Sequence, residues 1–181
     1  MMLVMRLITL APKVMGLAVL PFFLGCAKGH IPPAAELGYL GLERQKSFDL
    51  YELRFLANID FYNIFEENKR PISSTLRCSL ELENVPMSDK ADEYSASGLV
   101  SIAQPVQGSE VWAYTSVLSF YENLDGGRSR RTLRADEFQR ILQGKEFVPC
   151  VYMATAFGFK TYRSEVMRIP VADIFREVGL Q

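Results

Sequence analysis

The chain is poor in the side chains that most often carry out catalysis. It contains one histidine, His30, which lies in a stretch rich in glycine and proline. A catalytic base must be held within hydrogen-bonding reach of its substrate in a shaped pocket, and such a stretch provides none. The acidic residues Asp89, Asp92 and Glu93 lie in a polar segment that lacks the glycine of a calcium-binding loop. The sequence therefore predicts no catalytic, metal-binding or cofactor-binding residue and a protein that is not an enzyme.

Four arginines form the one dense cluster of like charge. Arg128, Arg130, Arg131 and Arg134 lie within seven residues, directly after a glycine-rich turn at 125–127. The planar guanidinium group binds both oxygens of a carboxylate or phosphate. The cluster is therefore a candidate partner-binding patch for an acidic protein or anionic lipid head groups. The alternative is a solvated hairpin end whose arginines form ion pairs within the chain.

The N-terminal residues have the character of a secretory signal. Arg6 and Lys13 are the only charged residues before Lys28, and the run 14–25 is apolar with small residues near its end. A positive start, an apolar core of about 7–15 residues and a small residue before the cut define such signals. The apolar run is shorter than the roughly 20 residues that a membrane-spanning helix needs. We therefore expect residues 1–25 to be a signal peptide.

The end of this segment resembles the processing site of bacterial lipoproteins. Phe23, Leu24, Gly25 and Cys26 occupy the positions of an apolar residue, two further residues and the modified cysteine. The resemblance implies lipidation of Cys26 by a diacylglyceryl group and a further acyl chain such as palmitate, and two or more chains anchor a protein stably. Ala27 stands where an aspartate would retain the protein in the inner membrane, which implies the outer membrane, facing the periplasm. An ordinary cleaved signal and an uncleaved anchor are the alternatives.

Removal of the signal leaves 156 residues, enough for one domain with a substantial core. Lys plus Arg falls from 20 to 18 while Asp plus Glu stays at 21, so the formal net charge is −3. A chain without basic character is not expected to bind nucleic acid. Its 49% hydrophobic and 12% aromatic content is typical of a folded protein.

The other two cysteines form an even pair once Cys26 carries lipid. Exported proteins meet an oxidising compartment, so we expect a Cys78–Cys150 disulfide; two buried thiols are the alternative. Cys78 lies on the apolar side of the clearest strand, where Leu76, Cys78 and Leu80 alternate with polar residues. The disulfide would therefore be buried.

Further alternating or apolar segments predict a mainly β domain. Expected strands cover 48–61, 75–83, 98–104, 110–122, 147–162 and 165–169. Ala135–Gln143 and the segment after Pro170 show helical spacing. Short connections favour antiparallel pairing. We expect a two-layer antiparallel β-sandwich, Ig-like or transthyretin-like, with a short internal helix and a C-terminal helix; a small closed barrel is the alternative.

Two features of this layout matter for function. Residues 26–46 contain several glycines and prolines and are expected to form a lipidated, flexible tether, which leaves 47–181 as a single periplasmic domain. Trp112, Tyr114, Leu118 and Phe120 share one face of a strand. This aromatic stripe is either core or an exposed recognition surface.

We therefore expect a lipid-anchored envelope protein that binds a protein partner without catalysis. Envelope-assembly lipoproteins, secretion accessories and immunity-type inhibitors share this general design, as an analogy of architecture only. A periplasmic binder of a lipid or other apolar small ligand is the alternative, which an apolar cavity would support. An enzyme that uses two facing carboxylates is a third possibility.

Overall fold

The computed structural model describes residues 33, 35–46, 48–65, 69–81 and 92–180, with backbone alone for 102–105. Strands dominate, with two α-helices and one 3-10 turn. In chain order, the elements are β1 (Leu37–Arg44), β2 (Leu50–Ala57), β3 (Ser73–Ser79), β4 (Tyr94–Pro105), β5 (Trp112–Leu124), η1 (Asp125–Gly127), β6 (Ser129–Thr132), α1 (Ala135–Leu142), β7 (Phe147–Thr155), β8 (Tyr162–Arg163), β9 (Met167–Pro170) and α2 (Val171–Val178).

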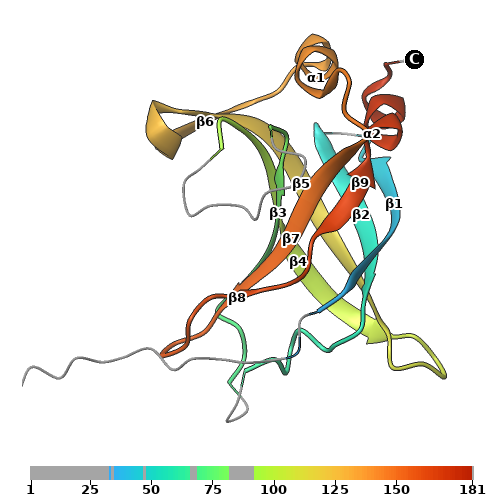
Figure 1. Ribbon diagram of the computed structural model, residues 1–181, viewed down its shortest axis with the longest axis vertical. Helices are drawn as coiled ribbons and strands as arrows, with labels where there is room; N and C mark the ends of the chain where they lie inside the picture. The colour runs from blue at the N-terminus through green and yellow to red at the C-terminus, as the bar shows by residue number, and fades with distance from the viewer. Residues whose placement is uncertain (1–32, 34, 47, 66–68, 82–91, 181) are drawn as a thin grey trace, which may run out of the picture.

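The described strands form one antiparallel sheet that curls into a half-barrel (Figure 1). Its order is β1-β2-β5-β4-β3-β7-β8, with β6 beside β5 and β9 beside β7. The mainly β, antiparallel character predicted from the sequence is confirmed. All described strands are hydrogen-bonded within this one curled sheet, so the finer prediction of two separate layers is not confirmed. One curled sheet buries its concave face against itself and the helices.

The alternation of apolar residues decides which face is concave. Leu76 and Cys78 of β3 and Leu118 and Phe120 of β5 are at most 1% exposed. Their shared orientation follows from the two-residue period of a strand. The aromatic stripe of β5 is therefore core, although Trp112 at its start is only half-buried.

Local irregularities bend the sheet. The register shifts between Tyr39 and Gly41 in β1 and between Ser101 and Gln104 in β4, and such bulges increase local twist. Gly98 of β4 lies so close to β5 that an added Cβ would be 2.1 Å from the carbonyl oxygen of Val117. No other residue type fits there without displacing backbone.

The domain begins earlier than expected. The predicted tether 26–46 includes β1, which pairs with β2 along its whole length. The glycines that favoured a linker, Gly38 and Gly41, lie within this strand, where they weaken the strand pattern without preventing pairing. Residues 26–32 of the predicted tether lie outside the described residues.

Strand β1 also lies against β9 and α2, which draws the two ends of the domain together. The backbone N–H of Glu165 donates to Ala35 O at 2.9 Å. The Tyr39 hydroxyl donates to the Asp173 carboxylate of α2 at 2.6 Å. These contacts cover the edge of β1 that would otherwise be open.

Most other element predictions agree with the structure. Helix α1 covers the expected segment, and α2 starts after Pro170 and ends at Gly179, whose φ of 83° is the left-handed conformation of a helix stop. The long strand expected at 147–162 is interrupted instead. Strand β7 ends at Thr155, and a turn with Gly158 at φ 81° leads to β8.

The two ends of the half-barrel differ. Helices α1 and α2 lie together at one end (Figure 1). The β2–β3 connection, the β4–β5 turn and the β7–β8 turn lie at the other end, where the described chain also begins. We call this second end the loop end.

Candidate functional site

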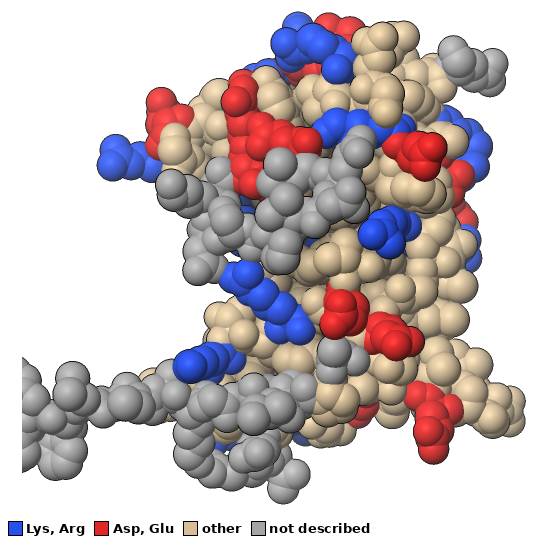
Figure 2. All heavy atoms as spheres, in the orientation of Figure 1, with Lys and Arg blue, Asp and Glu red and all other residues tan. Residues whose placement is uncertain are grey.

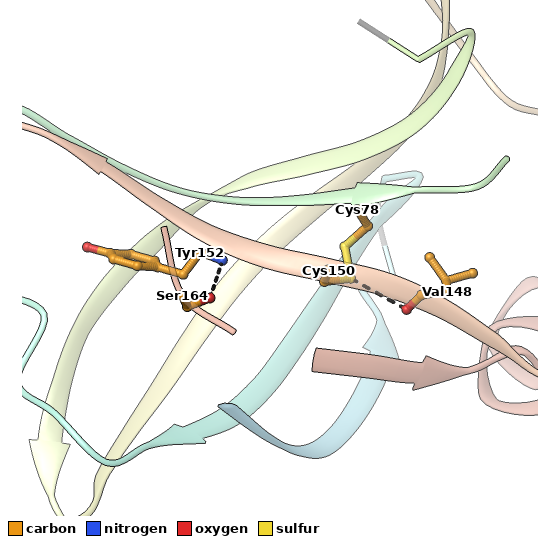
Figure 3. Close-up of a disulfide and its surroundings, with 5 residues drawn as sticks. All are labelled: Cys78, Val148, Cys150, Tyr152 and Ser164. Atoms are coloured by element: carbon orange, nitrogen blue, oxygen red, sulfur yellow. Dashed lines mark hydrogen bonds between the residues drawn. A yellow bond between two sulfur atoms is a disulfide. The ribbon is translucent and has the colours of Figure 1, made fainter. Parts of the chain in front are cut away.

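The predicted disulfide is present in the structure. Cys78 of β3 and Cys150 of β7 are cross-strand neighbours, and their Sγ atoms are 2.06 Å apart (Figure 3). Both residues are fully buried. Further along β7, the Tyr152 N–H donates to Ser164 Oγ at 2.9 Å (Figure 3). The disulfide thus joins two strands that also contribute to the cavity described below. The predicted lipidation site, Cys26, lies outside the described residues.

The predicted arginine patch is largely occupied by contacts within the chain. Arg131 donates to both oxygens of Glu137 in α1, at 2.8 and 2.9 Å, and to Glu122 of β5. The side chain of Glu137 is only 8% exposed. Its carboxylate also accepts the backbone N–H of Arg134 at 2.9 Å. These bonds, led by that from Arg131, lower the pKa of Glu137 from 4.5 to about 2. We call Glu122, Arg131 and Glu137 the arginine clamp, since they fasten α1 to the sheet.

The remaining arginines of the patch differ in their surroundings. The Arg134 side chain lies 3.6 Å from Asp136, and the Arg130 guanidinium lies 4.3 Å from the ring centroid of Tyr121. Arg128 is exposed and forms no ion pair with another residue of the described ranges. Figure 2 shows acidic and basic atoms interspersed around the helical end and no uniform basic surface. The sequence-based alternative, a hairpin end with internal ion pairs, describes this region better than a free binding patch.

A cavity of about 250 Å³ opens at the loop end of the half-barrel. It is formed on the concave face by β3, β4, β5 and β7 and closed from one side by the β2–β3 connection. Most of its surface is aromatic or small and polar. Its lining residues are Asp60, Phe61, Tyr62, Pro71, Ser74, Val100, Ser101, Trp112, Tyr114 and Tyr152. Since an apolar cavity of about 150 Å³ already admits benzene, this one is large enough for a small organic group.

The aromatic wall of this cavity is rigidly held. The Phe61 ring stacks on Tyr152 with centroids 3.7 Å apart and contacts Tyr114 at 4.6 Å. The Tyr114 oxygen accepts the Phe61 N–H at 2.8 Å. The hydroxyls of Tyr152 and Ser74 are hydrogen-bonded at 2.9 Å. The Phe61, Tyr114 and Tyr152 rings are thus fixed by stacking and hydrogen bonds, so this part of the site is pre-formed.

The charge of the cavity comes from Asp60. One oxygen of its carboxylate accepts the Tyr62 N–H at 2.9 Å, and the other accepts the Asn63 side-chain amide at 2.7 Å. Burial raises the pKa of Tyr152 to about 12 and raises that of Tyr114 still further. Both phenols are therefore neutral near pH 7, and Asp60 is the one charged residue among the described lining residues.

Sequence reasoning missed the cavity wall contributed by the β2–β3 connection. Leu53, Phe55 and Phe61 fall in one alternating phase, so the apolar pattern predicts a strand through Phe61, whereas β2 ends at Ala57. The turn residues Asp60 and Asn63 were the available signal, because their side chains bond to nearby backbone and favour turns.

The described ranges contain no group of three or more His, Cys, Asp or Glu side chains placed to hold a metal ion. No helix there has the length and apolar character to cross a membrane. Asp92 and Glu93 precede β4, whereas Asp89 and His30 lie outside the described residues. No protein-family model, no curated protein and no solved structure matches this chain.

Proposed function

We propose that this protein is a lipid-anchored, non-enzymatic binding protein of the bacterial cell envelope that takes up a small, mainly apolar ligand in its aromatic cavity. The observation that carries the proposal is the cavity of about 250 Å³ at the loop end. Concave, mostly apolar sites with a few placed polar groups are typical of small-molecule binding. The hydroxyls of Ser74 and Tyr152 and the Asp60 carboxylate are such groups.

The position of the N-terminus supports an anchored receptor. The Tyr162 hydroxyl accepts the Ala35 N–H at 3.0 Å, and the Tyr162 ring lies 6.2 Å from that of Tyr152 in the cavity wall. The chain thus enters the domain at the loop end. Pro33 is the seventh residue after Cys26, and this length of chain, fully extended, reaches about 25 Å. Lipid on Cys26 would keep the cavity near the membrane surface, and the disulfide suits an oxidising compartment.

A protein-binding module, as an assembly or secretion accessory or an immunity-type inhibitor facing the periplasm, has less support. It rested on the arginine cluster, but Arg131 and Arg134 contact carboxylates and Arg130 stacks on an aromatic ring. Breaking those contacts to bind a partner would cost free energy. Of the four arginines, only Arg128 forms neither an ion pair nor a ring contact with another described residue, and one exposed arginine does not define a partner.

Ligand uptake can be tested with the intrinsic fluorescence of Trp112, the only tryptophan of the chain, which lines the cavity. The mature domain is titrated with small aromatic and branched aliphatic alcohols. We expect saturable changes in emission that Ser101→Phe, which adds bulk at the cavity, abolishes. Ser129→Phe, a matched change on exposed β6, should leave them intact. Absence of saturation with every probe, confirmed by calorimetry, contradicts a ligand-binding cavity.

Anchoring is tested separately in cells. Cys26→Ala should release the protein from the membrane fraction or leave its precursor uncut. Metabolic labelling with a fatty-acid analogue should label the protein that retains Cys26 and should not label Cys26→Ala. If Cys26→Ala changes neither membrane attachment nor gel mobility, the lipoprotein proposal fails.

A further inference from the structure

The described lining of the cavity at the loop end carries one negative charge, that of Asp60, and this charge indicates which class of small molecule binds there. Resting on the proposed function, we infer that the ligand is a small organic cation, an ammonium or similar onium group with an apolar surface, held by the aromatic wall and Asp60. The aromatic lining alone would accept many neutral groups. The Asp60 carboxylate among these rings is what favours a cation.

The rings offer faces on which a cation is attracted. The negative face of an aromatic ring attracts a positive group within about 6 Å of its centroid, and the attraction grows where water is excluded. Trp112, the best type of ring for this contact, and Tyr62 are half-buried at the cavity. Tyr114 and Tyr152 are at most 4% exposed behind them. A quaternary ammonium group carries no N–H donor, so an aromatic wall leaves none of its hydrogen bonds unmet.

Among the described residues, none forms an ion pair with the acid. Asp60 forms hydrogen bonds to Tyr62 and Asn63, both neutral donors, and no ion pair with any Lys or Arg in the described part of the chain. Its field reaches the cavity, since it contributes to the raised pKa of both Tyr114 and Tyr152. An anionic ligand would be repelled, and a neutral one would leave the carboxylate without an opposite charge.

The same end of the molecule already shows cations on aromatic rings. The Arg70 guanidinium lies 4.5 Å from the ring centroid of Tyr62, which lines the cavity. The Lys69 ammonium lies 5.3 Å from that of Phe159 in the β7–β8 turn. Arg70 is exposed. These two contacts show that ring faces at the loop end are accessible to positive groups.

The experiment compares the binding of a cation with that of a neutral compound of the same shape. Choline and 3,3-dimethylbutan-1-ol have the same shape and differ in the charge of one central atom. Their affinities for the mature domain are measured from Trp112 emission and by calorimetry. We expect choline to bind about tenfold more tightly, within what a partly desolvated cation–π contact and a carboxylate provide.

Asp60→Asn removes the negative charge of the cavity and keeps the size of the side chain. The asparagine oxygen can still accept the Tyr62 N–H, so the turn is retained, which circular dichroism checks. We expect about a tenfold loss of choline affinity and unchanged affinity for the alcohol. Asp125→Asn is the matched control: Asp125 follows the far end of β5, thirteen residues beyond Trp112 and about 40 Å away along the strand. It should change neither affinity.

The outcomes distinguish the two proposals. Equal binding of both compounds, unaffected by Asp60→Asn, overturns the cation inference and leaves the ligand-binding cavity standing. Tighter binding of the alcohol than of choline does the same. If neither these compounds nor the neutral probes above bind the folded domain, the proposed function fails and the inference fails with it.

Discussion

The arginine clamp makes a quantitative prediction about acid sensitivity. In the unmodified protein, three hydrogen bonds of 2.8 to 2.9 Å reach the Glu137 carboxylate, two from Arg131 and one from the Arg134 backbone. In Glu137→Gln, an NH2 group that cannot accept a hydrogen bond replaces one carboxylate oxygen, and the negative charge is lost. Since hydrogen bonds to a charged group contribute about 1.5–3 kcal/mol, we expect a loss of about 2 kcal/mol in the free energy of unfolding at pH 7.

The pH dependence gives the prediction its sign. The pKa of Glu137 is lowered from 4.5 to about 2 in the folded state, chiefly by Arg131. Its contribution to stability is therefore complete above pH 4.5 and is lost as the pH falls toward 2. The difference in stability between the unmodified protein and Glu137→Gln should shrink over that range.

The assay is urea unfolding followed by circular dichroism at pH 7, 4 and 3, together with the melting temperature. A loss of about 2 kcal/mol corresponds to about 4–8 °C for a chain of this size. Asp136→Asn is the control, because this neighbouring carboxylate is 73% exposed and lies 3.6 Å from Arg134. An exposed pair contributes at most about 1 kcal/mol. Equal effects of the two substitutions, or a difference that is as large at pH 3 as at pH 7, would refute the clamp as a stabilising element.

Three further predictions concern the rest of the domain. Replacing Cys78 and Cys150 together by alanine removes a cross-link over 72 residues, and the free energy of unfolding should fall by about 4 kcal/mol in the chain-entropy model; urea titration showing less than a quarter of this contradicts it. Gly98→Ala should lower stability by about 3 kcal/mol or more because of its backbone clash, whereas Gly38→Ala, whose added Cβ meets its nearest atom at 3.7 Å, should melt within a few degrees of the unmodified protein. Arg70→Gln removes a positive charge beside the cavity and should tighten choline binding about threefold, so weaker binding by calorimetry would argue against an electrostatic site.

Local signals made some elements predictable. The alternation around Cys78 predicted both β3 and the buried side of its cysteine, because a strand has a fixed two-residue period. Pro170 and Gly179 bounded α2 through their own backbone preferences. Each of these predictions depended on a few consecutive residues.

The remaining features depend on distant partners. Whether strands form two layers or one curled sheet is decided by bulges and by the close approach at Gly98, which no local pattern reveals. Arg131 is indistinguishable from Arg128 in sequence, yet only Arg131 meets Glu122 and Glu137 after folding. The cavity forms only when Phe61, which precedes β3, packs on Tyr152 of β7, and the two residues are far apart in the sequence.

The meeting of β1 with the last elements has a consequence for the order of folding. The bond between Tyr39 and Asp173 joins residues 134 apart in the chain, and among the described elements β9 and α2 cover the edge of β1. Contacts of such separation require closure of a long loop before they contribute stability. During synthesis, a chain still lacking its final elements would leave β1 exposed, so cooperative folding must wait until nearly all of the polypeptide has emerged.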